Sequence, residues 1–121
     1  MAKVYVFLAD GFEDVEALIP IDVLRRGGQE VVTVSVMGDS QVVESAHGVQ
    51  IVADALFDDV VLSDAQLLLL PGGMPGASNL YDHEELGEAL ISHSAQLTCI
   101  LAAQQSLKAR IASGTTPVQQ S

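Results

Sequence analysis

The chain has 121 residues, of which 49% are hydrophobic, 4% aromatic and 17% charged. This length favours one domain, and the apolar share is high enough to build a core, which excludes a disordered chain. The 16 acidic residues outnumber the 5 basic ones and give a net charge of −11, so we exclude nucleic acid and anionic membrane surfaces as partners.

A single cysteine, Cys99, excludes an intramolecular disulfide and favours a reducing compartment. The N-terminal sequence passes from Lys3 directly into an apolar run that is too short for a membrane span and is followed by no cleavage site. We therefore expect a cytoplasmic protein without a targeting segment.

The first part of the chain alternates strand and helix patterns. Residues 3–9 are almost continuously apolar, which predicts a strand buried on both faces, as in parallel sheets. Residues 30–37 repeat that pattern, and a helical period starting at Asp14 fills the segment between them. Strand, helix and strand in this order predict a βαβ unit with a right-handed crossover.

The helix between these strands has one apolar stripe at helical spacing, formed by Val15, Leu18, Ile19 and Val23. Acidic residues precede or begin this helix, and Arg25-Arg26 lie in its last turn, where each charge suits the helix dipole. Gly27-Gly28 end it. Because Pro20 removes one helical hydrogen bond, we expect a kink or a late start there.

A small hairpin is predicted next, because short β-prone runs at 41–44 and 49–52 flank a tetrapeptide that contains His47. Residues 54–64 are mixed and predict a short helix or loop with exposed aspartates.

The rest of the chain continues the alternation. Residues 67–70 predict a third buried strand, which ends at a loop rich in proline and glycine over 71–76. A helix is predicted over 84–94, a short strand over 97–101 and a further helix over 102–112.

Together these elements predict a doubly wound, mostly parallel α/β sheet. One domain would span residues 1–112, and the polar segment 113–121 would form a flexible tail. Ligands bind such folds at the carboxyl ends of the strands, here at Asp10-Gly11, the 71–76 loop and Leu101-Ala102.

Two features at these strand ends are candidates for a site. Glu16 lies in the first turns of the first helix, where it either faces a site or serves as a solvated acid that suits the helix dipole. Gly72-Gly73 directly follow a buried strand, so they either turn backbone N–H groups toward an anion or oxyanion or form a plain turn. The P-loop and GxGxxG patterns are absent, so no nucleotide cofactor is predicted.

The thiol and the histidines are weaker candidates. Cys99 is predicted in the middle of a strand, which favours a buried, inert thiol over a reactive one. His47, His83 and His93 show no metal-ligand spacing with Cys99, so we predict no metal site.

Three segments carry a resemblance to a known family: VYVFLADGFEDVEALIPIDVLRRGG at 4–28, HGVQIVAD at 47–54 and LLLLPGGMPGASNL at 67–80. With them the chain resembles the DJ-1/PfpI (ThiJ-like) superfamily, close to its DJ-1/YajL-like branch, over residues 3–101. The resemblance implies a flavodoxin-like α/β fold and a homodimer. Members of that family are longer than this chain, so the resemblance also implies a sheet that is incomplete at its C-terminal end.

The resemblance also implies a site. Family members place a cysteine at a strand-to-helix elbow, where a glutamate from the first helix hydrogen-bonds it and a glycine pair stabilises an anion or oxyanion. Glu16 matches that glutamate, and Gly72-Gly73 match the glycine pair. At the elbow, however, Ala102 stands where the cysteine belongs, Gln105 stands where a proline belongs, and Cys99 falls three residues too early.

Family members are credited with glyoxalase and deglycase activity, holding-chaperone behaviour and oxidative-stress sensing. The resemblance therefore implies small carbonyl compounds or glycated protein groups as partners, with no cofactor. The covalent and redox chemistry of the family needs the elbow thiolate. Because Ala102 stands at that position, we expect this chain to lack the nucleophile. Two alternatives stay open: a non-enzymatic holdase or binding module, and a minimal enzyme that uses Cys99.

Overall fold

The computed structural model describes residues 3–92 and 97–99. Its strands are β1 (Lys3–Leu8), β2 (Glu30–Ser35), β3 (Val42–Glu44), β4 (Gln50–Val52), β5 (Ala55–Leu56), β6 (Ala65–Leu70) and β7 (Leu97–Cys99). Its helices are α1 (Asp14–Arg26), α2 (Gly76–Asp82) and α3 (Glu84–Ser92), with two 3-10 turns, η1 (Phe57–Asp59) and η2 (Leu62–Asp64). The predicted helix over 102–112 and the predicted tail over 113–121 lie outside the described residues.

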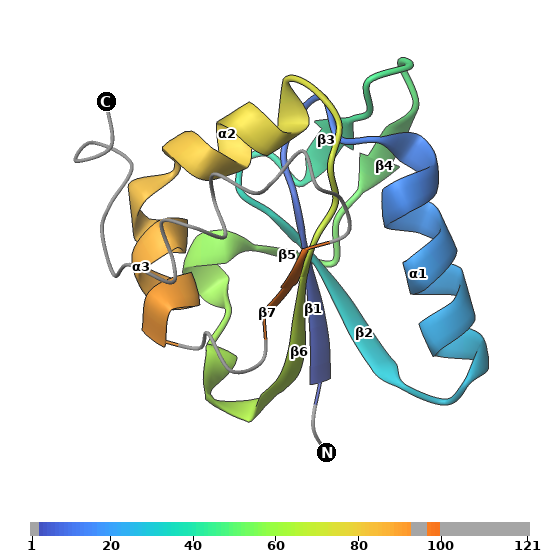
Figure 1. The fold of residues 1–121 in the computed structure, drawn as a ribbon, viewed down its shortest axis with the longest axis vertical. Helices are drawn as coiled ribbons and strands as arrows, with labels where there is room; N and C mark the ends of the chain where they lie inside the picture. The colour runs from blue at the N-terminus through green and yellow to red at the C-terminus, as the bar shows by residue number, and fades with distance from the viewer. Residues whose placement is uncertain (1–2, 93–96, 100–121) are drawn as a thin grey trace.

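Five strands form one sheet in the order β5-β2-β1-β6-β7, and every pairing within it is parallel. The order places β1 at the centre, between β2 and β6. The helix α1 covers one face of the sheet, while α2 and α3 lie on the other (Figure 1). This arrangement confirms the predicted doubly wound, mostly parallel α/β fold.

Side chains of β1 alternate between two hydrophobic clusters, one on each face of the sheet. Tyr5 and Phe7 pack in the cluster that includes residues of α2 and α3, such as Leu80 and Leu86. Val4, Val6 and Leu8 pack in the cluster on the α1 side. Both faces are covered, which is why the sequence of β1 is continuously apolar rather than alternating.

The helix α1 has its predicted extent but not the orientation that its stripe suggests. Ala17 and Ile21 are the buried residues of this helix. The stripe at helical spacing is instead exposed, at 40–58% of each side chain: Val15, Leu18, Ile19 and Val23. Pro20 lies inside the helix, which continues past it to Arg26.

The predicted hairpin is confirmed as the antiparallel pair β3–β4, which stands apart from the main sheet. Two elements were not predicted from the sequence. The strand β5 pairs with β2 through only two residues, too few to leave a pattern. The helix α2 begins at Gly76, the last residue of the predicted 71–76 loop, and its seven residues were not predicted.

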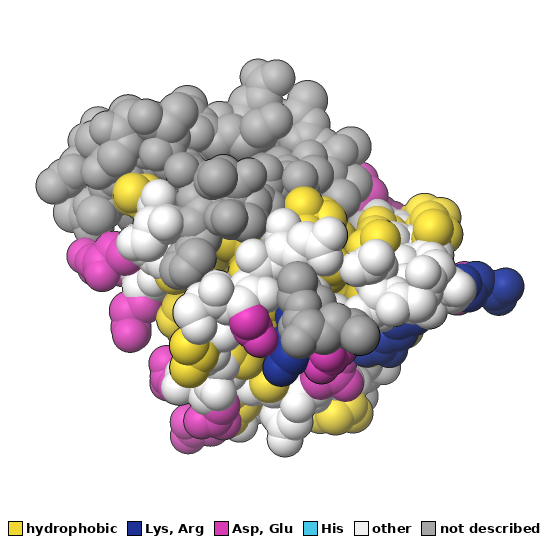
Figure 2. Space-filling model, turned by 90° about the horizontal axis from the view of Figure 1, so that it is seen from below, with side chains coloured by type: hydrophobic (Ala, Val, Ile, Leu, Met, Phe, Trp, Pro, Cys, Tyr) yellow, Lys and Arg dark blue, Asp and Glu magenta, His cyan; other side chains and the backbone are white. Residues whose placement is uncertain are grey.

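Charged side chains on the outside of the molecule are mostly acidic. Figure 2, which looks at the end where β1 begins, shows acidic side chains spread across this face with few basic ones among them. Lys3 lies there, 3.7 Å from carboxylate oxygens of both Glu30 and Asp64. No helix in the described part of the chain is long and apolar enough to cross a membrane.

Candidate functional site

Two loops meet at the carboxyl end of the sheet, one after β1 and one after β6. These strands are neighbours, so the loops that leave them start side by side. The Glu13 N–H donates a hydrogen bond to the Gly72 carbonyl oxygen (2.8 Å). The Gly76 N–H donates a second one, to the Gly11 carbonyl oxygen (3.1 Å). The two loops therefore form one backbone-to-backbone contact.

Glycine is required for this close approach. Gly73 has a φ of +95°, and a Cβ placed on it would lie 2.5 Å from the Glu13 nitrogen. A Cβ on Gly76 would lie 2.6 Å from the Phe12 nitrogen. Real Cβ atoms do not come this close to a backbone atom, so these positions exclude larger residues unless the loops move apart.

The contact brings two candidate residues together. Glu16, partly buried in the first turn of α1, accepts a hydrogen bond at Oε1 from the Gly72 N–H (2.8 Å). The Glu16 carboxyl group therefore lies against the backbone that follows β6, and its role in a site stays a prediction. The Gly72 N–H is used by this bond, whereas in the described part of the chain no protein acceptor is found for the Gly73 N–H.

The described part of β7 ends with Cys99, which pairs with Leu70, the last residue of β6. The Cys99 backbone is therefore level with the end of β6, two residues before Gly72. Ala102 and Gln105, the positions of the family nucleophile and proline, lie outside the described residues.

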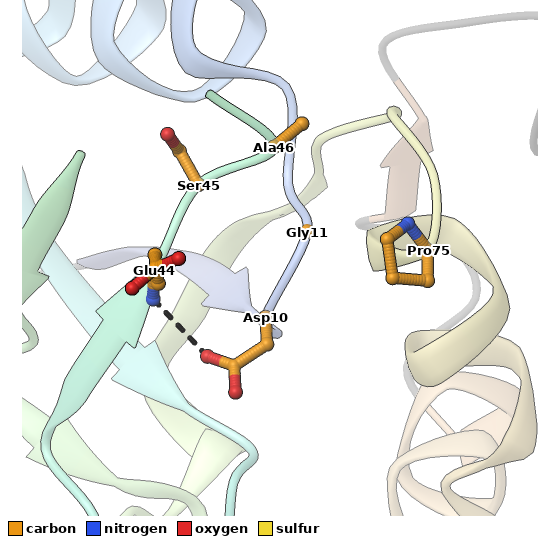
Figure 3. Close-up of a pocket in the computed structure, with 6 residues that line it drawn as sticks. All are labelled: Asp10, Gly11, Glu44, Ser45, Ala46 and Pro75. Atoms are coloured by element: carbon orange, nitrogen blue, oxygen red, sulfur yellow. Dashed lines mark hydrogen bonds between the residues drawn. The ribbon is translucent and has the colours of Figure 1, made fainter. Parts of the chain in front are cut away.

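The hairpin β3–β4 docks onto the loop after β1. The Gly11 N–H donates to the Glu44 carbonyl oxygen (2.8 Å), and the Glu44 N–H donates to Asp10 Oδ1 (3.1 Å). A pocket of about 380 Å³ opens between this junction and the loop after β6 (Figure 3). Its lining consists of Asp10, Gly11, Glu44, Ser45, Ala46 and Pro75.

A second contact ties the hairpin to the start of α1. The Ser45 hydroxyl donates to Asp14 Oδ2 (2.7 Å), and His47 Nδ1 lies 2.9 Å from Asp14 Oδ1. The hydrogen bonds from Ser45 and His47 lower the pKa of Asp14. The bond to Asp14 and its negative charge raise the pKa of His47.

The cluster of Asp14, Ser45 and His47 was not predicted from the sequence. Asp14 and His47 are 33 residues apart, and the sequence shows His47 only as a histidine without metal-ligand spacing to Cys99. The hairpin was predicted, but its pattern holds no information about the surface on which it docks. Ser45, between β3 and β4, is a polar residue that the docking buries to 4% exposure.

Comparisons with known proteins point to one family. The DJ-1/PfpI family matches residues 2–114. "Protein DJ-1 homolog B" of Arabidopsis thaliana is 47% identical over 79 residues, which cover 64% of this chain and 18% of that protein. "Deglycase TK1284" of Thermococcus kodakarensis is 35% identical over 71 residues, 59% of this chain and 42% of that protein.

Among solved structures, oxidized DJ-1 of Toxoplasma gondii matches with a TM-score of 0.79 and 36% identity, over 88% of this chain and 61% of that chain. The chain spans less than two thirds of each of these three proteins. The family match nevertheless extends over nearly the whole sequence. The chain therefore belongs to the DJ-1/PfpI family.

Proposed function

We propose that the chain holds the substrate-positioning half of a DJ-1/PfpI site for small carbonyl compounds or glycated protein groups. The observation that supports this proposal is the 2.8 Å hydrogen bond between the Gly72 N–H and Glu16 Oε1 at the carboxyl end of the sheet. The similarity to a protein named as a deglycase points to the same substrate class.

In this site Glu16 and Gly73 have different tasks. The Gly72 N–H fixes one carboxylate oxygen of Glu16, which leaves the second oxygen for a substrate hydroxyl or amine. The Gly73 N–H is available to a carbonyl oxygen that gains negative charge, as a backbone donor of an oxyanion hole. Neither group forms a covalent bond to the substrate.

We further propose that the chain binds such groups without turnover, because Ala102 stands where the resemblance places the nucleophile. The purified chain should consume methylglyoxal no faster than buffer does. It should still bind a peptide that carries early glycation adducts, and Glu16→Gln should weaken that binding by about tenfold, while Glu88→Gln on the exposed face of α3 should not. Turnover that Glu16→Gln abolishes would contradict the proposal.

One observation favours the alternative in which Cys99 is the nucleophile. Its backbone pairs with Leu70 at the end of β6, and Leu70 precedes Gly72 by two residues. A thiol at a strand end with a lowered pKa reacts rapidly with iodoacetamide at neutral pH. Labelling of the folded chain together with turnover that Cys99→Ser removes would establish this alternative, and an unlabelled Cys99 would exclude it.

We also propose a cytoplasmic homodimer that forms through the exposed stripe of α1. Four exposed apolar side chains on one helix face are unusual on a monomer and are typical of a contact surface. Sedimentation of the purified chain should show a dimer, and Ile19→Lys should convert it to a folded monomer. A monomeric wild type that suppresses client aggregation would instead support the holdase alternative.

A further inference from the structure

One imidazole and two carboxylates meet where the hairpin docks onto the start of α1. One ligand atom from each of Glu13, Asp14 and His47 lies within 4.8 Å of the other two. None of these side chains takes part in the Glu16–Gly72 contact. We propose that Glu13, Asp14 and His47 form a binding site for a divalent transition-metal ion, with Zn²⁺ the best match.

The spacing of the donor atoms fits such an ion. Tetrahedral Zn²⁺ holds nitrogen and oxygen ligands at about 2.0–2.1 Å, which places neighbouring ligand atoms roughly 3.3 Å from each other. His47 Nδ1 and Asp14 Oδ1 are already 2.9 Å apart. They need to separate by a few tenths of an ångström, and rotation of the longer Glu13 side chain brings in the third ligand.

The environment positions two of the ligands and leaves the third free to move. The Ser45 hydroxyl, buried in the hairpin, holds Asp14 Oδ2 and so directs Oδ1 toward His47. Hydrogen bonds of this kind orient carboxylate ligands in metal sites. The Glu13 carboxylate acts on His47 through its charge, but among the described residues no hydrogen bond or ion pair holds it in place.

The donor set selects the type of ion. Mg²⁺ and Ca²⁺ prefer six or more oxygen ligands, whereas an imidazole nitrogen with two carboxylates suits Zn²⁺ and related transition metals. The positive end of the α1 dipole opposes a cation at this place. Two ligand carboxylates and a chain charge of −11 act in the opposite direction and outweigh that dipole.

The test is a Zn²⁺ titration of the full 121-residue chain against a chromophoric chelator. The wild type should take up one equivalent that Mg²⁺ does not displace. His47→Asn and Asp14→Asn should each weaken this binding by at least about tenfold. Because 71% of the His47 side chain is exposed, the His47→Asn variant should stay folded and decides the outcome if Asp14→Asn does not fold.

Two matched controls separate this site from general charge and histidine effects. Asp22→Asn removes the same charge from the exposed face of α1, where Asp22 pairs with Arg26. In the wild type, the Leu86 N–H donates a hydrogen bond to His83 Nδ1 (3.0 Å) at the start of α3. His83→Asn removes the histidine but keeps an acceptor for this N–H. Both controls should retain wild-type affinity.

Three results would overturn the proposal. The first is a wild type that takes up no Zn²⁺ under these conditions. The second is a His47→Asn variant with wild-type affinity. The third is an intense thiolate-to-metal band when Co²⁺ replaces Zn²⁺, because that band would place the ion on Cys99. None of these results bears on carbonyl binding by Glu16.

Discussion

Glu16 reaches the Gly72 N–H because the loops after β1 and β6 approach each other at backbone distance. That approach depends on Gly73, whose φ is +95° and whose missing Cβ leaves room for the Glu13 nitrogen. A left-handed φ strains any other residue, and a steric clash adds to the strain.

We expect Gly73→Ala to destabilise the chain by roughly 2–4 kcal/mol, since it combines left-handed strain with the clash at Glu13. The control is Gly28→Ala, because Gly28 has a similar φ of +88° with nothing within 4 Å of the added Cβ. That variant should lose only about 1 kcal/mol. Urea unfolding measures both, and equal losses would contradict the role of close packing.

Tyr5 is a buried polar residue in the centre of the sheet. Its side chain is only 3% exposed, and its hydroxyl donates to Asp64 Oδ1 (2.7 Å) and lies 3.2 Å from the Val61 carbonyl oxygen. Burial, followed by the hydrogen bond and negative charge of Asp64, raises the pKa of Tyr5 from 10.0 to about 12. Asp64 has a lowered pKa because it accepts this bond.

The direction of the Tyr5 shift predicts how stability depends on pH. The folded state favours the protonated phenol, so this contribution is complete below pH 10 and is lost as the pH rises toward 12. An absorbance titration of phenolate should show a step near pH 12 that Tyr5→Phe removes. Persistence of that step in the variant would contradict its assignment to Tyr5.

At the level of elements, Asp54 connects α1, β2 and the segment between β4 and β5. Its Oδ2 accepts hydrogen bonds from Arg25 (2.9 Å) and from the Thr33 N–H (3.0 Å). Its own N–H donates to Thr33 Oγ1 (2.8 Å). The Arg25 ion pair is half exposed and contributes little, whereas Thr33 is buried and its N–H needs an acceptor.

Two substitutions of Asp54 should therefore differ. Asp54→Asn keeps an oxygen acceptor for Thr33 and should cost less than about 1 kcal/mol of unfolding free energy. Asp54→Ala leaves the Thr33 N–H unpaired and should cost about 1–3 kcal/mol. Asp58→Ala, on an exposed residue of η1, serves as the control and should change little. Equal losses for both Asp54 variants would assign the effect to the ion pair.

At the level of the whole molecule, charge repulsion opposes folding. The net charge is −11, and the described ion pairs of Lys3, Arg25 and Arg26 lie at the surface, where each is worth about 0–1 kcal/mol. Repulsion among the acidic residues therefore outweighs the attraction within these ion pairs, and salt screens both.

We expect the urea midpoint of the chain to rise between 10 mM and 150 mM salt, because the screening length falls from about 30 Å to about 8 Å. The transition should be cooperative, since β1 supplies side chains to both hydrophobic clusters and links their unfolding. A lower midpoint at high salt would show that ion pairs dominate, and a non-cooperative transition would contradict the shared core.

Much of the architecture follows from the amino-acid pattern. Continuous apolar runs at 3–9 and 30–37 predicted central parallel strands, because only strands covered on both faces can bury such runs. The sequence pattern left two interpretations of Glu16 open, and the family resemblance favoured the one in which Glu16 faces a site. The family assignment itself is confirmed, while the roles of Ala102 and Cys99 stay predictions.

Only the tertiary structure decided how these elements face one another. The apolar stripe of α1 lies outside, since the sheet accepts only the smaller surface around Ala17 and Ile21. The contact of Asp14 with His47 joins residues 33 positions apart, and it exists because the hairpin docks beside the helix start. Periodicity records which face of an element is apolar, but the surface that covers this face depends on contacts between distant segments, and these form only when the chain folds.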